Sequence, residues 1–129
     1  MPLARIDVPV GQSADYRSAV GDVVYNAMIS TLNAPKNDRF QVITEHPSGG
    51  LVIDPTYLGI QRTERAIIIQ VTLNEGRTVD MKRAFYKAVA DGLYERLGHR
   101  REDVIINLVE VKKENWSFGN GEEIGRAHV

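Results

Sequence analysis

The fold is decided by residues 2–33, which read PLARIDVPVGQSADYRSAVGDVVYNAMISTLN. In residues 3–8 apolar side chains alternate with their neighbours, and this period of two is typical of a β-strand. Over residues 16–33 apolar side chains instead recur every three or four positions, as they do along one face of a helix. Ser13 can cap the start of this helix, and Pro35 prevents its continuation. The stretch therefore predicts a strand followed by a helix.

The rest of the chain continues this plan and then repeats it. A second alternating segment at residues 40–44 predicts a strand after the first helix. Residues 66–73 form a β-branched run, and residues 81–97 carry apolar side chains at helical spacing. Residues 104–111 are apolar at nearly every position. Near-continuous apolar strands separated by helices indicate β-α-β units.

These elements define the predicted organisation of the chain. The stretch from His46 to Glu64 is rich in proline and glycine and predicts a loop that can hold one short strand at residues 51–53. We expect one α+β domain over residues 1–129, with two β-α-β halves at about 2–46 and 65–112 and a C-terminal tail. The four strands would form one sheet with two helices on one face.

That arrangement leaves the second face of the sheet without helices. Two helices can cover one face of a four-stranded sheet but not both. Strands that are apolar on both sides need a partner for the second face, so the pattern predicts an oligomer.

Composition excludes several classes of function. The 16 basic residues are interspersed with 17 acidic ones, so the chain lacks the basic stripe that nucleic-acid binding requires. The absence of cysteine rules out thiolate chemistry and Cys-based metal sites, and His46, His99 and His128 show no metal-ligand spacing. No dinucleotide or P-loop motif is present, so we expect neither metal nor cofactor. No apolar run could span a bilayer and no signal peptide is evident, so we expect no membrane partner and a cytoplasmic location.

Three segments together resemble a known enzyme family. Pro2 precedes the first strand, residues 34–41 read APKNDRFQ, and residues 110–121 read EVKKENWSFGNG. These segments are similar to the tautomerase superfamily, and within it to the malonate semialdehyde decarboxylases, whose corresponding motifs are P-x-N-D-R-[YF]-Q and D-W-S-F-G-x-G. The resemblance covers nearly the whole chain. It implies the fold of macrophage migration inhibitory factor, a homotrimer with sites near the subunit boundaries, and a catalytic N-terminal proline freed by removal of Met1.

The resemblance assigns roles to four residues. Pro2 would act through its secondary amine as a general base or acid, with Asp38 beside it to raise its pKa or activate water. Trp116 and Phe118 would form an apolar wall that desolvates the amine. Without the resemblance each residue has a plain alternative. Proline is common after the initiator methionine, Asp38 suits a turn and could pair with Arg39, and the two aromatic residues could belong to the core.

The loop before the second helix is the point of departure from that family. Arg77 lies near a helix N-terminus, where a cation is unfavourable by a few tenths to ~1 kcal/mol, so a functional reason for it is plausible. The guanidinium and the helix amides together could bind a substrate carboxylate, although Arg77 could simply pair with Glu75. The decarboxylases carry two arginines one residue apart here, and Glu75 stands in place of the first.

Glu75 bears on which chemistry Pro2 performs. At ~6 Å and an effective dielectric of ~20, its carboxylate would raise the pKa of the amine by roughly two units. Asp38 acts in the same direction, which favours a protonated Pro2. A protonated Pro2 suits decarboxylation of a small 3-oxo acid whose carboxylate is held by Arg77, and this is our leading hypothesis. Glu75 would also weaken binding of an anionic substrate.

Two alternatives stay open. A neutral Pro2 would suit a keto–enol tautomerase of a 2-oxo acid such as phenylpyruvate. A binding homologue without turnover is the non-enzymatic alternative, and it predicts a retained Met1 or an inert Pro2.

Overall fold

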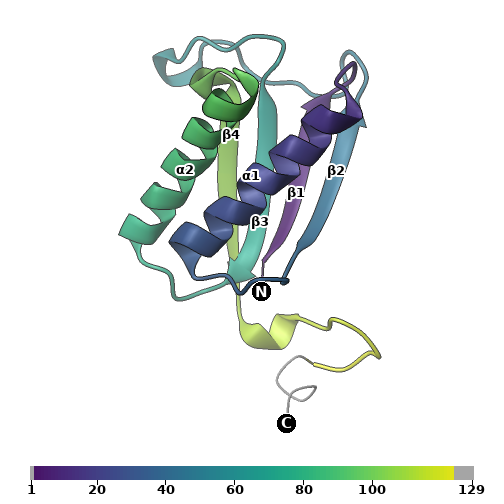
Figure 1. Ribbon diagram of the computed structural model, residues 1–129, viewed down its shortest axis with the longest axis vertical. Helices are drawn as coiled ribbons and strands as arrows, with labels where there is room; N and C mark the ends of the chain where they lie inside the picture. Colours follow the sequence, from purple (N-terminus) through teal and green to yellow (C-terminus); the bar gives the residue numbers. More distant parts are fainter. Residues whose placement is uncertain (1, 124–129) are drawn as a thin grey trace.

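The computed structural model describes residues 2–123 and contains one mixed sheet packed against two helices (Figure 1). In chain order the elements are β1 (Leu3–Pro9), α1 (Ala14–Leu32), β2 (Phe40–His46), β3 (Ile67–Asn74), α2 (Val79–Leu97) and β4 (Val104–Val111). The strand order is β2-β1-β3-β4, with parallel outer pairs and an antiparallel central pair of β1 and β3. Both helices lie on one face of the sheet, which confirms the predicted α+β arrangement. None of the helices among the described residues is long and apolar enough to cross a membrane.

Local capping explains where both helices begin and end. The side-chain oxygens of Ser13 and Thr78 accept hydrogen bonds from the backbone N–H three residues later, at 3.0 and 3.2 Å. At the other ends, Asn33 and Gly98 adopt left-handed conformations, with φ of 56° and 63°. These residues satisfy backbone groups that a helix end leaves without partners, so each helix stops where the sequence predicts.

The core lies between the helices and the covered face of the sheet. Every second residue of the central strands is buried there: Ala4, Ile6, Val8, Ile67, Ile69, Val71 and Leu73. From the helices, Phe85, Val89 and Leu93 are fully buried against them. The two helices approach closely at Gly92, where an added Cβ would lie 2.9 Å from a methyl carbon of Val23.

The opposite side of the sheet, which we call the open face, carries no helix among the described residues. It is formed by the alternate residues of each strand and includes Phe40, Val42 and Val109, which are 45, 39 and 37% exposed. Polar side chains are mixed with them, for example Gln70, whose amide donates to Asn107 at 3.3 Å. The open face is therefore partly apolar, as the sequence predicts.

The loop between β2 and β3 differs from the sequence prediction. Residues 51–53 are not a strand, and Val52 is 86% exposed. The only helical segment of this loop, all of which the structure describes, is a 3-10 turn at Tyr57–Gly59. Arg62 holds the loop locally, since Nη1 donates to the carbonyls of Asp54 and Tyr57 at 3.2 and 3.1 Å. A strand needs a neighbouring strand for its backbone groups, and residues 51–53 have no strand partner among the described residues.

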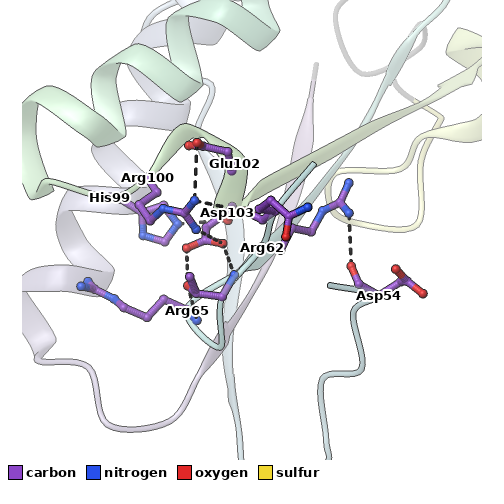
Figure 2. A network of polar contacts seen from close by, with 9 residues as sticks. Asp54, Arg62, Arg65, His99, Arg100, Glu102 and Asp103 are labelled. Carbon is purple, nitrogen blue, oxygen red and sulfur yellow. Dashed lines mark hydrogen bonds and ion pairs between the residues drawn. The ribbon is translucent and has the colours of Figure 1, made fainter. Parts of the chain in front are cut away.

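A polar network fastens the end of this loop to the start of β4 (Figure 2). Asp103 is 1% exposed, and its carboxylate accepts hydrogen bonds from the backbone N–H and the hydroxyl of Thr63. The side chain of Arg100 lies 3.5 Å from the same carboxylate and also donates to the carbonyl of Gln61 at 3.1 Å. The network therefore joins two segments about 40 residues apart.

Two of the three histidines lie among the described residues, and each has a polar partner. His46 is the last residue of β2 and lies 2.6 Å from the Asp7 carboxylate. His99 is buried, with Nε2 donating to the carbonyl of Asp103 at 3.0 Å and Nδ1 3.3 Å from the Tyr16 hydroxyl. His128 lies outside the described residues. Among residues 2–123 no group of three or more metal-ligating side chains is gathered.

Candidate active site

The strand register brings the predicted site residues to one end of the sheet. Leu3 pairs with Phe40 in the parallel neighbour and with Thr72 in the antiparallel one. Asn74, at the end of β3, pairs with Val111 at the end of β4. The starts of β1 and β2 therefore meet the ends of β3 and β4. Each predicted site residue immediately precedes or closely follows one of these strand ends.

Pro2 and Asp38 enter this end of the sheet from adjacent strands. Pro2 is buried directly before β1, and both carboxylate oxygens of Asp38 are shielded from solvent two residues before β2. The turn before Asp38 is shaped by Asn37, whose φ of 67° is in the left-handed region that asparagine tolerates. The backbone N–H of Asn37 donates to the Tyr25 hydroxyl at 2.9 Å, which ties the turn to α1.

Arg39 is directed toward α1. Its Nη2 donates to the Asp22 carboxylate at 3.0 Å, and its guanidinium lies 4.8 Å from the centre of the Tyr25 ring. The hydrogen bond from Arg39 lowers the pKa of Asp22, with Arg96 acting in the same direction and burial opposing them. The charge of Arg39 is thus engaged with Asp22 on the helix.

Arg77 is held by two backbone carbonyls. Nε donates to the carbonyl of Leu32 at 3.0 Å, and Nη1 donates to that of Asn74 at 2.9 Å. Leu32 is the last residue of α1, so the guanidinium satisfies a carbonyl at the helix C-terminus, where the dipole favours a cation. Within the described chain these carbonyls, rather than the Glu75 carboxylate, accept hydrogen bonds from Arg77, which contradicts the simple ion-pair alternative. Nη2 takes part in neither of these two bonds.

Glu110 supplies a negative charge close to this loop. The Lys82 ammonium donates to it at 2.6 Å and lowers its pKa, with burial opposing and the Gly76 N–H and the Arg77 charge acting in the same direction as Lys82. Glu110 is thus held ionised by groups on α2 and on the loop that precedes it.

Glu75 is exposed at the mouth of a hollow. Its backbone N–H donates to the carbonyl of Val111 at 2.9 Å, which extends the pairing of β3 and β4 by one residue. The hollow has a volume of about 700 Å³ and is lined by Asn74, Glu75, Val111, Lys112, Lys113, Glu114 and Glu123. Glu75 therefore faces a mixed-charge surface.

A larger hollow lies at the opposite end of the sheet. Its volume is about 840 Å³, and its lining includes Pro9, His46 and Ala66. Of the predicted site residues, all of which the structure describes, none lines it. Size alone therefore does not identify the site, and the chemistry gathers at the end where Pro2 lies.

The C-terminal tail covers the Pro2 end of the sheet. Trp116 Nε1 donates to Asn74 Oδ1 at 2.7 Å, and the Trp116 ring stacks on Phe118 with centroids 5.1 Å apart. Phe118 in turn lies 5.0 Å from the ring of Phe40. The tail thus contacts the end of β3 and the start of β2, and β1 lies between these strands. In Figure 1 the tail, drawn in yellow, lies beyond the end of the sheet where the chain begins.

For Trp116 and Phe118 the sequence left two alternatives, a place in the core or a place in an apolar wall of the site. Trp116 is half-buried and Phe118 is 38% exposed, so neither belongs to the core between sheet and helices. Their position agrees with the wall that the sequence resemblance implies.

Asn74 and Tyr25 are two residues of this region that the sequence did not single out. Asn74 reads only as the end of a strand and Tyr25 only as a member of a helix. Their partners, Trp116 and Asn37, are 42 and 12 residues away, so only the fold reveals the contacts. The only signal for Asn74 in the sequence was its place at the end of a predicted strand.

Comparison with known proteins gives a consistent picture. A family model described as "tautomerase enzyme" matches residues 38–119, and a second model with the same description matches residues 2–61. A probable tautomerase of Bacillus subtilis (strain 168), YusQ, is 37% identical over 94% of this chain and 95% of its own length.

Solved structures extend the comparison. FG41 malonate semialdehyde decarboxylase inhibited by 3-bromopropiolate has a TM-score of 0.90 and 32% identity, covering 98% of this chain and 95% of that one. A symmetric trimer of a fused 4-OT has a TM-score of 0.79 at 21% identity, with 98% of this chain and 99% of that one covered, and this likeness concerns the fold alone.

Proposed function

This chain belongs to the tautomerase superfamily of enzymes, and we propose that it decarboxylates a small 3-oxo acid with Pro2 as its key catalytic group. The observation that supports this most is that Pro2, Asp38 and Arg77 lie at one end of the sheet, the end that the Trp116–Phe118 segment contacts. The likeness to FG41 malonate semialdehyde decarboxylase, at 32% identity, points in the same direction.

Pro2 has a free secondary amine only after Met1, which lies outside the described residues, is removed. An α-amino group titrates near ~8 in model peptides. Burial disfavours its charged form, whereas a nearby Asp38 carboxylate favours it. The wall and the carboxylate therefore tune the amine in opposite directions. In our proposal the carboxylate prevails and Pro2 is protonated.

The reaction uses the protonated amine and the guanidinium together. Pro2 donates a hydrogen bond to the 3-oxo group, and Arg77 Nη2 orients the substrate carboxylate. The bond between the carboxylate carbon and C2 breaks, carbon dioxide leaves, and the electron pair forms an enol that takes its oxygen proton from Pro2. A proton from solvent then adds to C2 while the enol oxygen returns its proton to the Pro2 amine, which gives the aldehyde or ketone and restores the protonated amine. The apolar wall favours this step, because the enol and carbon dioxide are uncharged whereas the substrate carboxylate is charged.

A keto–enol tautomerase is the second candidate, and Glu75 is the observation that favours it. The decarboxylases carry two arginines in this loop. Here Glu75 replaces the first of them, so only Arg77 is left to bind a substrate carboxylate. A 2-oxo acid needs one such contact while neutral Pro2 moves a proton between carbon and oxygen. The name of YusQ, a probable tautomerase, agrees with this alternative.

The test compares two substrates and two proline variants. Intact mass first establishes whether Met1 is removed. Turnover of malonate semialdehyde and of phenylenolpyruvate is then measured for wild type, Pro2→Ala and Pro9→Ala. Pro9 ends the same strand at the far end of the sheet, so Pro9→Ala is the matched control. We expect Pro2→Ala to lose on the order of 100-fold or more in kcat/KM and Pro9→Ala to retain activity.

The outcomes separate the candidate functions. Turnover of the enol alone would assign a tautomerase. Equal activity of wild type and Pro2→Ala would contradict the proline mechanism. A retained Met1, or no turnover of either substrate, would point to the binding homologue. A covalent label provides an activity-independent check: 3-bromopropiolate should modify the N-terminal peptide of wild type but not of Pro2→Ala.

A further inference from the structure

We propose that Asn74 is a positioning residue that fixes the Trp116 wall and the Arg77 guanidinium relative to each other. Its effect on turnover rests on the proposed function, whereas its effect on Trp116 does not. Asn74 ends β3, and its backbone carbonyl accepts from Arg77 while its side-chain oxygen accepts from Trp116. One residue thus contacts both groups proposed to surround the substrate.

The orientation of the Asn74 amide follows from the chemistry of its partner. An indole N–H can only donate, so the atom 2.7 Å from Trp116 Nε1 is the amide oxygen. The Nδ2 group, with two N–H donors, therefore faces away from the indole. Asn74 also lines the hollow of about 700 Å³.

The bond to Asn74 determines where the tail lies. The segment around Trp116 has little regular structure of its own: a 3-10 turn at Lys113–Asn115 precedes it, and a single bridge joins Ser117 to Glu123. At Trp116 the tail is attached to the end of β3, and at Phe118 to the start of β2. Removing the first attachment leaves the stacked rings held from one side only, so the wall over Pro2 would move.

Arg77 is linked to the same residue by the main chain. Nη1 donates to the Asn74 carbonyl, and this bond survives any side-chain substitution. A change in the Asn74 side chain therefore removes the contact with Trp116 and leaves the contact with the Arg77 guanidinium in place. A merely structural role for Asn74 would alter stability but not the position of Trp116.

Fluorescence provides a direct readout, because Trp116 is the only tryptophan of the chain. We expect Asn74→Ala to shift its emission to longer wavelength and increase quenching by acrylamide. Asn74→Asp keeps an oxygen acceptor and should leave the emission close to that of wild type. Asn107→Ala is the matched control, since Asn107 lies on the same face in β4 and its amide accepts from Gln70 rather than from Trp116.

Kinetics then test the coupling to the site. We expect Asn74→Ala to raise KM about 3- to 10-fold, the range of one lost hydrogen bond, with a smaller change in kcat. Trp116→Phe removes the indole N–H but keeps an aromatic ring at this position, so it should raise KM by a similar factor. The double variant should then be no worse than the more affected single variant, because both lose the same bond.

The proposal and the proposed function fail in different ways. Unchanged emission and quenching in Asn74→Ala would overturn the positioning role, whatever the activity. Changed emission with an unchanged KM in an active enzyme would also overturn it. A wild type that turns over neither substrate would count against the proposed function alone, and the fluorescence comparison would still decide the role of Asn74.

Discussion

At the scale of single residues, we expect Glu75 to affect how strongly the proposed site binds an anion. Arg77 is fixed by two carbonyls and cannot move far to compensate for a missing partner. Glu75 lies two residues before it, exposed at the mouth of the hollow. A carboxylate here repels a substrate carboxylate and, if it is close to Pro2, raises the pKa of that amine. The same residue can thus favour the protonated amine while it disfavours binding of the substrate.

Glu75→Arg separates these two effects. We expect KM for malonate semialdehyde to fall roughly 10-fold or more, because a charged hydrogen bond replaces a repulsion. The pKa of Pro2 should fall as well, so the alkaline limb of the kcat/KM profile should move to lower pH for an acid mechanism. Both are measured by steady-state kinetics across pH. Glu114→Arg, at the rim of the same hollow, is the matched control. An unchanged KM in Glu75→Arg would show that Glu75 does not face the substrate.

At the scale of elements, the network around Asp103 makes the junction of loop and β4 sensitive to pH. Burial alone would raise the pKa of Asp103, but the two hydrogen bonds from Thr63 and the charges of Arg100 and His99 outweigh it and lower this pKa. A lowered folded-state pKa stabilises the fold above the ordinary carboxyl pKa of about 4, and the stabilisation is lost as pH falls through the lowered value.

Asp103→Asn should therefore reduce stability at neutral pH and change its acid dependence. The two oxygens of Asp103 accept one hydrogen bond each from Thr63, and an asparagine side chain has only one oxygen. We therefore expect a loss of about 1–3 kcal/mol in the free energy of unfolding at pH 7. The difference from wild type should shrink below pH 4, where the wild-type carboxylate gains its proton. Urea unfolding at several pH values measures both. Glu102→Gln, exposed in the same turn, should change stability little, and a constant difference at all pH values would contradict the prediction.

The elements also show which features the sequence can predict. Helix caps such as Ser13 and Thr78 act on residues three positions away, so local pattern suffices for them. The loop at residues 51–53 was predicted wrongly as a short strand because an apolar run has no strand character without a pairing partner. The role of His99 was missed because its partner Tyr16 is 83 residues away in sequence. Pro2, Asp38 and Arg77 were chosen mainly by resemblance, and their meeting at one end follows from strand register.

At the scale of the whole molecule, the two halves are related but only one end can carry amine chemistry. Each half has the order strand, helix of 19 residues, strand, and the halves meet through the antiparallel pair of β1 and β3. The residue before β3, the counterpart of Pro2, is Ala66. It is inside the chain, and its amide N–H donates to the Thr63 carbonyl at 3.2 Å. An amide nitrogen is not basic, so the second half offers the scaffold of the site without its reactive group.

The open face of the sheet leads to the last prediction, that the protein is a trimer. The sequence resemblance implies a homotrimer, and the mixture of apolar and polar side chains on the open face suits a contact with further copies of the chain. Multi-angle light scattering of wild type should therefore give three times the mass of the 129-residue chain. Val109→Glu places a charge on this face and should dissociate the trimer, because burying an unpaired carboxylate costs several kcal/mol. Val79→Glu, exposed at the start of α2 on the helical side, should remain trimeric. A monomeric wild type, or a trimeric Val109→Glu with unchanged stability, would show that the open face is not the contact.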